Sequence, residues 1–181
     1  MLYRTLMFMS RVACHTPRPI LLALGWVLGN LYYLIIAKMR RRAVAHMMPA
    51  LGIDEAAAKK LVRASFINMA RNFLDILAMP MLNERNFRDY IEIDHLERMQ
   101  AALAEGHGVV VLTGHIGCWE WLSAAFTLNG MPVSAIAKPQ PNIQYTRVLD
   151  DLRATIHVEI FSRGTSELIA AARALKRGKL L

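Results

Sequence analysis

From Tyr90 onward, short apolar runs rich in β-branched residues alternate with segments of helical character. Strands are predicted at 90–93, 109–112, 132–137 and 158–161, with helices at 94–105, 119–128, 142–156 and 165–176. Strands joined by helical crossovers pair in parallel. The sequence therefore predicts an α/β fold with a mainly parallel sheet. Residues 179–181 fall where a further strand would begin, so we expect this core to be truncated at its carboxyl end.

The turn after the strand at 109–112 carries a histidine and, five residues later, a carboxylate. Residues five apart on a helix lie roughly 140° apart around its axis. His115 and Glu120 can therefore meet only if His115 lies in the turn and Glu120 in the first turn of the next helix. A carboxylate on one imidazole nitrogen fixes the tautomer while the other nitrogen takes a proton. The alternative is a buried histidine that is satisfied by its neighbour.

The same turn contains two glycines and a cysteine. Gly114 and Gly117 would let backbone amides approach a reacting group, and the following helix terminus favours negative charge. Cys118 could act as a nucleophile instead, but the bulky Trp119 follows where such a turn needs a small residue. His115 and Cys118 are half of a metal site without a second ligand pair, so no metal is predicted.

The composition favours a membrane-associated protein with an anionic partner. The chain has 181 residues, 55% of them hydrophobic, a mean hydropathy of +0.27 and a net charge of +8. This charge suits anionic lipid or nucleic acid. The aromatic residues lie in apolar stripes rather than among the basic residues, which disfavours nucleic acid. A membrane-anchored basic module that binds lipid or nucleic acid remains the non-enzymatic alternative. Two distant cysteines, Cys14 and Cys118, indicate a reducing compartment.

An apolar run from Ile20 to Ala37 is 18 residues long and has Asn30 as its only strongly polar member. This length just suffices to cross a hydrocarbon core of about 30 Å. Basic residues follow at 38–42, which favours a cytoplasmic location for the downstream chain. We predict an uncleaved membrane anchor, with a buried or interfacial helix as the alternative.

A second helix is predicted from the Asp54 N-cap to Ala78, before Pro80. It has a basic side and an apolar stripe, which comprises Val62, Phe66, Met69, Phe73 and Ile76. Such a helix packs on a core, lies on anionic lipid, or forms a wall of an acyl-chain groove. The predicted organisation is a membrane anchor with a basic flank (1–48), an amphipathic helical segment (49–89) and an α/β core (90–181).

The chain resembles the bacterial lipid A biosynthesis acyltransferases, the lauroyl and myristoyl transferases, over nearly its whole length. The resemblance is carried by His-x4-Glu at 115–120, the segment 65–68, Lys138-Pro139 with Asn142, and Arg153. Two features depart from the family. Cys118 stands where many members carry Asn, and a carboxyl-terminal portion with a further Asp is absent.

The resemblance implies a glycerophosphate-acyltransferase-like fold and an enzyme without a cofactor. It would move a fatty acyl group from acyl carrier protein, or acyl-CoA, to a hydroxyl of a membrane glycolipid, a lipid A precursor. The reaction would take place at the cytoplasmic face of the bacterial inner membrane, with no nucleic-acid partner. His115 would be the general base and Glu120 its orienting partner, while backbone amides at Gly114 and Gly117 would hold the oxyanion.

The acceptor would bind the family's basic and amide positions. These are Arg153, Lys138 and Asn142, of which Arg153 offers a planar fork suited to a phosphate or carboxylate. A solvated position at a helix end is the alternative for each basic residue. The competing enzyme classes are a glycerophospholipid or lysophospholipid acyltransferase and an acyltransferase for another glycolipid.

Overall fold

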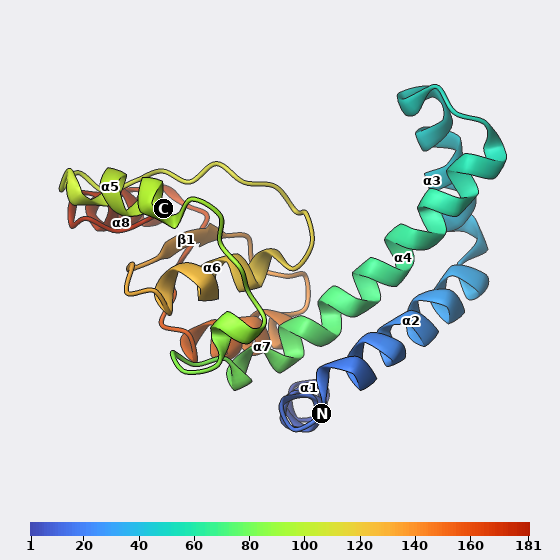
Figure 1. Cartoon of the computed structure of the whole chain (residues 1–181), viewed down its shortest axis with the longest axis horizontal. Coiled ribbons are helices and arrows are strands. Elements are labelled where there is room, and N and C mark those ends of the chain that lie inside the picture. Colours follow the sequence, from blue (N-terminus) through green and yellow to red (C-terminus); the bar gives the residue numbers. More distant parts are fainter. The chain divides into compact units, whose positions relative to one another are not determined.

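The computed structural model describes all residues from 1 to 181, and it is mostly helical with a small parallel sheet (Figure 1). The chain divides into two compact units, each described by itself below. One unit combines Met1–His15 with Ile76–Leu181, and the other comprises Thr16–Asp75. The predicted α/β class holds in its broad form, but the sheet has only two strands.

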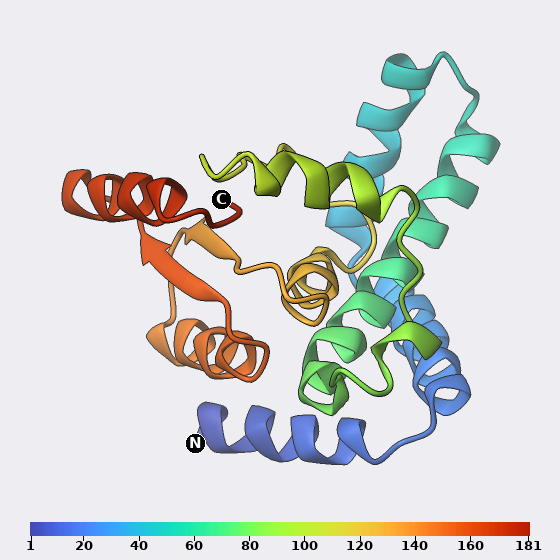
Figure 2. The same ribbon diagram turned by 60° about the vertical axis from the view of Figure 1, so that its left-hand side comes forward.

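The sheet of the first unit is a strand–helix–strand crossover. Strand β1 (Ser134–Ala137) pairs in parallel with β2 (Glu159–Ser162), with Ser134 opposite Glu159 and Ala137 opposite Ser162. Helix α7 (Ile143–Ala154) joins them, and α8 (Thr165–Lys176) follows β2, as the orange-to-red ribbon of Figure 2 shows. With α6 (Trp119–Thr127), these elements confirm the alternation predicted from residue 119 onward.

The last residues of the chain lie between two segments that are distant in sequence. Leu180 forms parallel bridges with Val109 on one side and Val133 on the other, and it is almost fully buried. The Leu180 amide donates to the Pro132 carbonyl, and the Ser134 amide donates to the Leu180 carbonyl, both at 2.8 Å. Parallel pairing thus extends beyond β1 and β2, although the added segments are too short to form strands.

Two predicted strands are absent. Residues 90–93 follow a 3-10 turn, η2 (Phe87–Asp89), and 91–93 have no ladder partner. In 109–112, Val109 is bridged to Leu180 and the Val111 amide donates to the Leu181 carbonyl at 2.8 Å, but no continuous ladder forms and Leu112 is 98% exposed. β-branched composition marks a segment that fits a sheet, but a strand exists only where a neighbour satisfies its backbone groups.

The start of the next helix also differs from the prediction. Helix α5 (Leu96–Ala104) begins after His95, which has a left-handed φ of 56°, and no side chain bonds to the helix end. The His95 Nδ1 instead lies 3.2 Å from Glu97 Oε1. The capping box predicted at Asp94 is therefore wrong.

Helix α1 (Leu2–Cys14), which falls in the segment predicted as an anchor, packs on α7. The Tyr3 amide donates to Gln144 Oε1 at 3.0 Å, and the Tyr3 hydroxyl donates to Asp151. At the other end of the helix, buried Ser10 donates its hydroxyl to the Leu77 carbonyl at 2.6 Å. The first helix is thus part of the unit that contains the sheet.

The second unit is built on an antiparallel pair of helices. It contains α2 (Arg18–Ile35), α3 (Ala37–Leu51) and most of α4 (Glu55–Ala78). Arg18 forms an ion pair with Asp75 at 2.8 Å, and the Arg63 Nε donates to Asn30 Oδ1 at 2.6 Å. These contacts lie near opposite ends of α2, so α4 runs back along its length. The predicted start of α4 is confirmed, since Asp54 Oδ1 accepts from the Ala57 amide at 2.7 Å.

The apolar stripe predicted on α4 is correct only in its first half. Val62 and Phe66 are buried in a cluster with Ala58 and Val44, whereas Met69 is 62% exposed. Phe73 is also exposed. In the second half of α4 the buried positions are instead Leu74 and Leu77, which are 4% and 2% exposed, so the buried face is not the one that a single continuous stripe predicts.

Two glycines four residues apart bring α2 and α4 together. A Cβ added at Gly29 would lie 2.4 Å from the Ile67 Cα, and one at Gly25 would lie 2.6 Å from the Arg71 Cγ. Small residues at this spacing allow helix backbones to approach closely. The backbone of α4 thus occupies the place that side chains at these positions would take.

We expect Gly29→Ala to destabilise the protein by about 1–3 kcal/mol, because the methyl group overlaps the α4 backbone. Helix propensity alone predicts the opposite sign, a gain of about 1 kcal/mol. The measurement is thermal unfolding of the detergent-solubilised protein by circular dichroism. Ala23→Gly, at an exposed position of the same helix, gives the propensity contribution by itself. A stabilised Gly29→Ala protein would contradict the close packing.

Asp75 gives the second unit a specific pH dependence. Burial raises the pKa of the Asp75 carboxyl, and the charge and hydrogen bonds of Arg18 only partly offset this shift. Because the folded pKa exceeds the unfolded one, the contribution of Asp75 to stability is full below the unfolded pKa. It is lost as the pH rises through the folded pKa.

We therefore expect the melting temperature of the wild type to fall relative to that of Asp75→Asn as the pH rises above about 4. Melting temperatures of both proteins across pH 3.5–7 test this expectation. Parallel curves, with a constant difference between the two proteins, would contradict it.

Candidate active site

Glu120 is the best-fixed residue of the candidate site. It lies in the first turn of α6 and is only 6% exposed. Arg153, in the last turn of α7, donates its Nε to Glu120 Oε2 at 2.8 Å and its Nη2 to Oε1 at 2.6 Å. This is a bidentate pair, the geometry in which a guanidinium holds a carboxylate most firmly.

The surroundings keep Arg153 positively charged. Burial by itself would lower the pKa of the guanidinium, but the hydrogen bonds and charge of Glu120 outweigh it, and the net shift is upward. Asp150, 3.6 Å from the Nη1, acts in the same direction. The amino end of α6 also favours the negative charge of Glu120. The site is therefore a buried ion pair. Removing either partner would leave the other as a buried charge without compensation.

His115 lies in the irregular segment before α6 and is exposed. Its ring packs on the Trp119 ring, with 4.7 Å between centroids and an interplanar angle of 52°. Both oxygens of Glu120 accept from Arg153, and His115 makes no hydrogen bond to either of them. The structure thus places the two predicted catalytic residues on one short segment, while their direct contact stays a prediction.

Gly117 sets the path of this segment into α6. Its φ of 59° is left-handed, and a Cβ there would meet nothing within 4 Å, so backbone conformation and not space calls for glycine. Cys118 follows at the N-cap position, where its carbonyl accepts from the Trp121 amide at 3.0 Å. The Gly114 carbonyl accepts from the Ile116 amide at 2.9 Å. Both predicted oxyanion glycines therefore lie in the turn beside His115.

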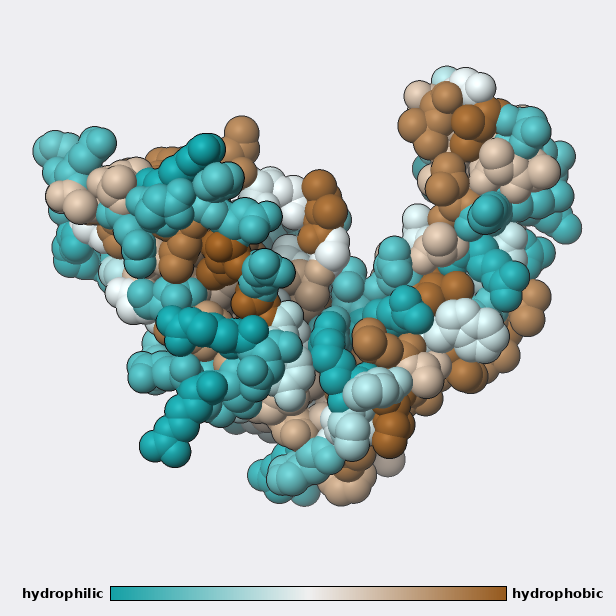
Figure 3. Space-filling model, viewed as in Figure 1, coloured by the Kyte–Doolittle hydropathy of each residue, from teal (hydrophilic) through white to brown (hydrophobic).

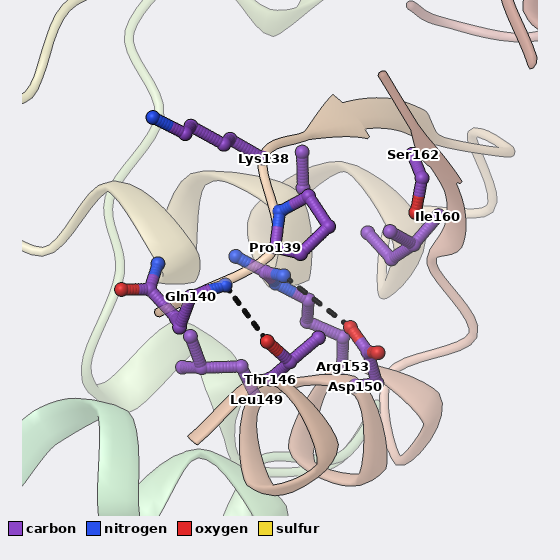
Figure 4. A pocket seen from close by; sticks show the side chains of 10 residues that line it. Lys138, Pro139, Gln140, Thr146, Leu149, Asp150, Arg153, Ile160 and Ser162 are labelled. Carbon is purple, nitrogen blue, oxygen red and sulfur yellow. Dashed lines mark hydrogen bonds and ion pairs between the residues drawn. The ribbon is translucent and has the colours of Figure 1, made fainter. Parts of the chain in front are cut away.

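Two of the three residues predicted to bind the acceptor, Lys138 and Arg153, line a small pocket (Figure 4). Its volume is about 20 Å³, room for a water molecule. Lys138 and Arg153 both line it, but the Lys138 side chain points away from Arg153 in Figure 4. Asn142 caps α7, where its Oδ1 accepts from the Gln144 amide at 3.0 Å. The structure thus brings Lys138 and Arg153 to one pocket and gives Asn142 a structural contact.

Sequence reasoning missed the partner of Glu120. Glu120 and Arg153 are 33 residues apart, on two helices separated by a strand, so no local pattern connects them. The capping by Asn142 did have a signal, because Asn before a helical segment is a preferred N-cap. No group of three or more His, Cys, Asp or Glu side chains is arranged to hold a metal ion.

Comparison with models of protein families identifies an acyltransferase. The model of the bacterial lipid A biosynthesis acyltransferases matches residues 3–181, and the chain therefore belongs to this family. No curated protein matches the chain. Membership makes the protein an enzyme of lipid A biosynthesis and indicates membrane association, for which α2 is the one helix long and apolar enough to span a bilayer.

We expect Arg153→Gln to lower the stability by about 3–5 kcal/mol, because it leaves the Glu120 carboxylate buried and unpaired. Arg153→Lys, which keeps the charge but loses the planar fork, should lose less. Urea unfolding in detergent measures the difference. Adding Glu120→Gln to Arg153→Gln should recover part of the loss. Asp150→Asn, at a largely exposed carboxylate on the same guanidinium, is the matched control. An Arg153→Gln protein as stable as this control would contradict the structural role.

Proposed function

We propose that the enzyme transfers a fatty acyl group from the thioester of acyl carrier protein to a hydroxyl of a membrane glycolipid, a lipid A precursor. The observation that supports this most directly is the fixed carboxylate of Glu120, five residues after His115 at the start of α6. Membership of the lipid A acyltransferase family supports the reaction class.

In the proposed reaction, His115 is the general base. One ring nitrogen takes the proton of the acceptor hydroxyl as that oxygen attacks the thioester carbonyl carbon. The carbon–sulfur bond then breaks, and the imidazolium returns the proton to the departing thiolate. The products are an ester and the free thiol of the carrier. Backbone amides at Gly114 and Gly117 and the amino end of α6 are the groups that would stabilise the oxyanion.

Glu120 can serve His115 while it remains bound to Arg153. A carboxylate has about four acceptor sites, and the two hydrogen bonds from Arg153 use one on each oxygen. The proposal therefore requires the exposed turn to bring His115 from Trp119 to Glu120, a movement about the flexible Gly114 and Gly117. Arg153 then acts as a positioning residue that holds Glu120 for this contact.

In this proposal the three predicted acceptor residues have different roles. The guanidinium of Arg153 is held by Glu120, and its Nη1 faces Asp150. Lys138 is exposed and is the cation best placed to meet a phosphate of the acceptor. Asn142 contributes by fixing the start of α7, the helix that carries Arg153.

The rest of the proposal concerns the fold and location of the catalytic unit. The parallel bridges of Leu180 with Val109 and Val133, next to β1 and β2, support a glycerophosphate-acyltransferase-like sheet. We place the unit that contains residues 90–181 at the cytoplasmic face of the inner membrane. There it would meet both a carrier protein in solution and a lipid in the membrane.

We expect His115→Ala to reduce acyl transfer by about 10²–10⁴-fold, the range for loss of a general base. The assay supplies labelled acyl–acyl carrier protein, with acyl-CoA in parallel, to the detergent-solubilised protein. The acceptors are a lipid A precursor, another glycolipid and a lysophospholipid, so the preferred acceptor separates the competing classes. His107→Ala, at another exposed histidine of the same unit, should retain full activity.

Two results would contradict the proposed function. Full activity of the His115→Ala enzyme would show that His115 is not the general base. Transfer to lysophospholipid alone would overturn the glycolipid acceptor and favour a phospholipid acyltransferase.

A further inference from the structure

Helix α2 has two faces of different character. One face packs on α4 through Gly25 and Gly29. The opposite face exposes large apolar side chains that are each 39–66% accessible: Ile20, Leu24, Val27, Leu28, Leu31, Leu34 and Ile35. At 1.5 Å per residue, the 18-residue helix makes this face about 27 Å long. An apolar surface of that extent marks a site of interaction.

Helix α4 makes a transmembrane position for α2 costly. Charged groups of α4 contact α2 near both of its ends and between them. Besides the contacts of Asp75 and Arg63, the Arg71 Nε donates to the Leu22 carbonyl at 3.3 Å. If α2 crossed a bilayer in this packing, these groups would be drawn into the hydrocarbon region, where charged side chains are strongly disfavoured. By itself α4 is not a candidate for a spanning helix.

The packing also disfavours a state in which α2 separates from α4 and crosses the bilayer alone. Gly25 and Gly29 contact the α4 backbone directly, and the rings of Tyr32 and Tyr33 pack on Phe66 with centroids 5.5 and 5.7 Å away. If α2 separated from α4, the α2 face with the two glycines would lose these partners. The ion pair between Arg18 of α2 and Asp75 of α4 would also break. The packing thus favours a state in which α2 and α4 remain in contact, and we call residues 16–75 with this packing the helical hairpin.

The hairpin also has the charge that suits an anionic membrane. Residues 16–75 hold nine of the 22 Lys and Arg residues but only three of the 14 Asp and Glu residues. Lys59, Lys60 and Arg63 line a groove of about 470 Å³ together with Trp26 and Leu34. Tryptophan and cations beside apolar groups are typical of the headgroup level of a membrane. In Figure 3, apolar side chains gather along α2, with hydrophilic side chains beside them.

We propose that residues 16–75 bind one leaflet of an anionic membrane as an in-plane helical hairpin, with α2 not crossing the bilayer. The outer face of α2 lies among the acyl chains, and Lys59, Lys60 and Arg63 contact lipid phosphates. This attachment does not depend on the catalytic chemistry. The experiments below require no acyl transfer, so their outcome is separate from that of the activity assay.

The first test asks whether the two ends of α2 lie on the same side of a membrane. In the 181-residue chain with Cys14→Ser and Cys118→Ser, single cysteines are introduced by His15→Cys or Met39→Cys, both at exposed positions. The proteins are added to preformed vesicles of phosphatidylethanolamine and phosphatidylglycerol and treated with a membrane-impermeant maleimide. We expect both cysteines to react from outside. Reaction at one end only, with the other protected until the vesicles are lysed, would overturn the proposal.

The second test addresses the cations. Lys59→Gln, Lys60→Gln and Arg63→Gln together should weaken binding to phosphatidylglycerol vesicles at least tenfold in a flotation assay. The matched control removes three exposed charges from the other unit, through Arg98→Gln, Arg173→Gln and Lys176→Gln, and should bind as the wild type does. Equal binding by both variants would overturn the assignment of the three cations. A wild type that ignores vesicles and sediments as a dimer would assign the apolar face to a second copy instead.

Discussion

The bidentate pair between Arg153 and Glu120 connects the sheet to the candidate active site. It joins the last turn of α7, which carries the crossover between β1 and β2, to the first turn of α6. The segment with His115 enters α6 directly, so its position depends on a helix end that this pair fixes. Because both charges are largely buried, the pair is maintained only while both partners are present. The stability of the fold and the geometry of the site therefore rest on the same contact.

Features that depend on nearby residues could be predicted from the sequence. The starts of α4 and α7 follow from the side-chain caps Asp54 and Asn142, and the extents of α6 and α8 follow from helical periodicity, all of which act over a few residues. Strands depend on partners elsewhere in the chain. Residues 132–137 and 158–161 find each other and form β1 and β2, whereas 90–93 find no partner and stay irregular. Their composition is alike, so composition could not separate them.

The same distinction applies to the candidate site. The spacing of His115 and Glu120 predicts that one lies in a turn and the other in the first helical turn, and the structure has this arrangement. The family resemblance places Arg153 at the acceptor, where an arginine fork suits a phosphate, but the fork fits the carboxylate of Glu120 equally well. Only the meeting of α6 and α7 shows which anion lies within reach. That contact is a property of the tertiary fold, because Glu120 and Arg153 are 33 residues apart in the sequence.

The hydropathy of a single helix does not decide whether that helix crosses a membrane, because the helix packed against it also matters. Taken alone, α2 meets the length and composition of a membrane span. The free energy of insertion, however, belongs to the helix together with whatever remains packed on it, and α4 brings charged groups to α2 along its length. Gly25 and Gly29 make that packing close, so separating the two helices would cost the contacts between their backbones. An apolar outer face on α2, packed against a helix that carries charged groups, therefore supports the proposed position at the surface of one leaflet.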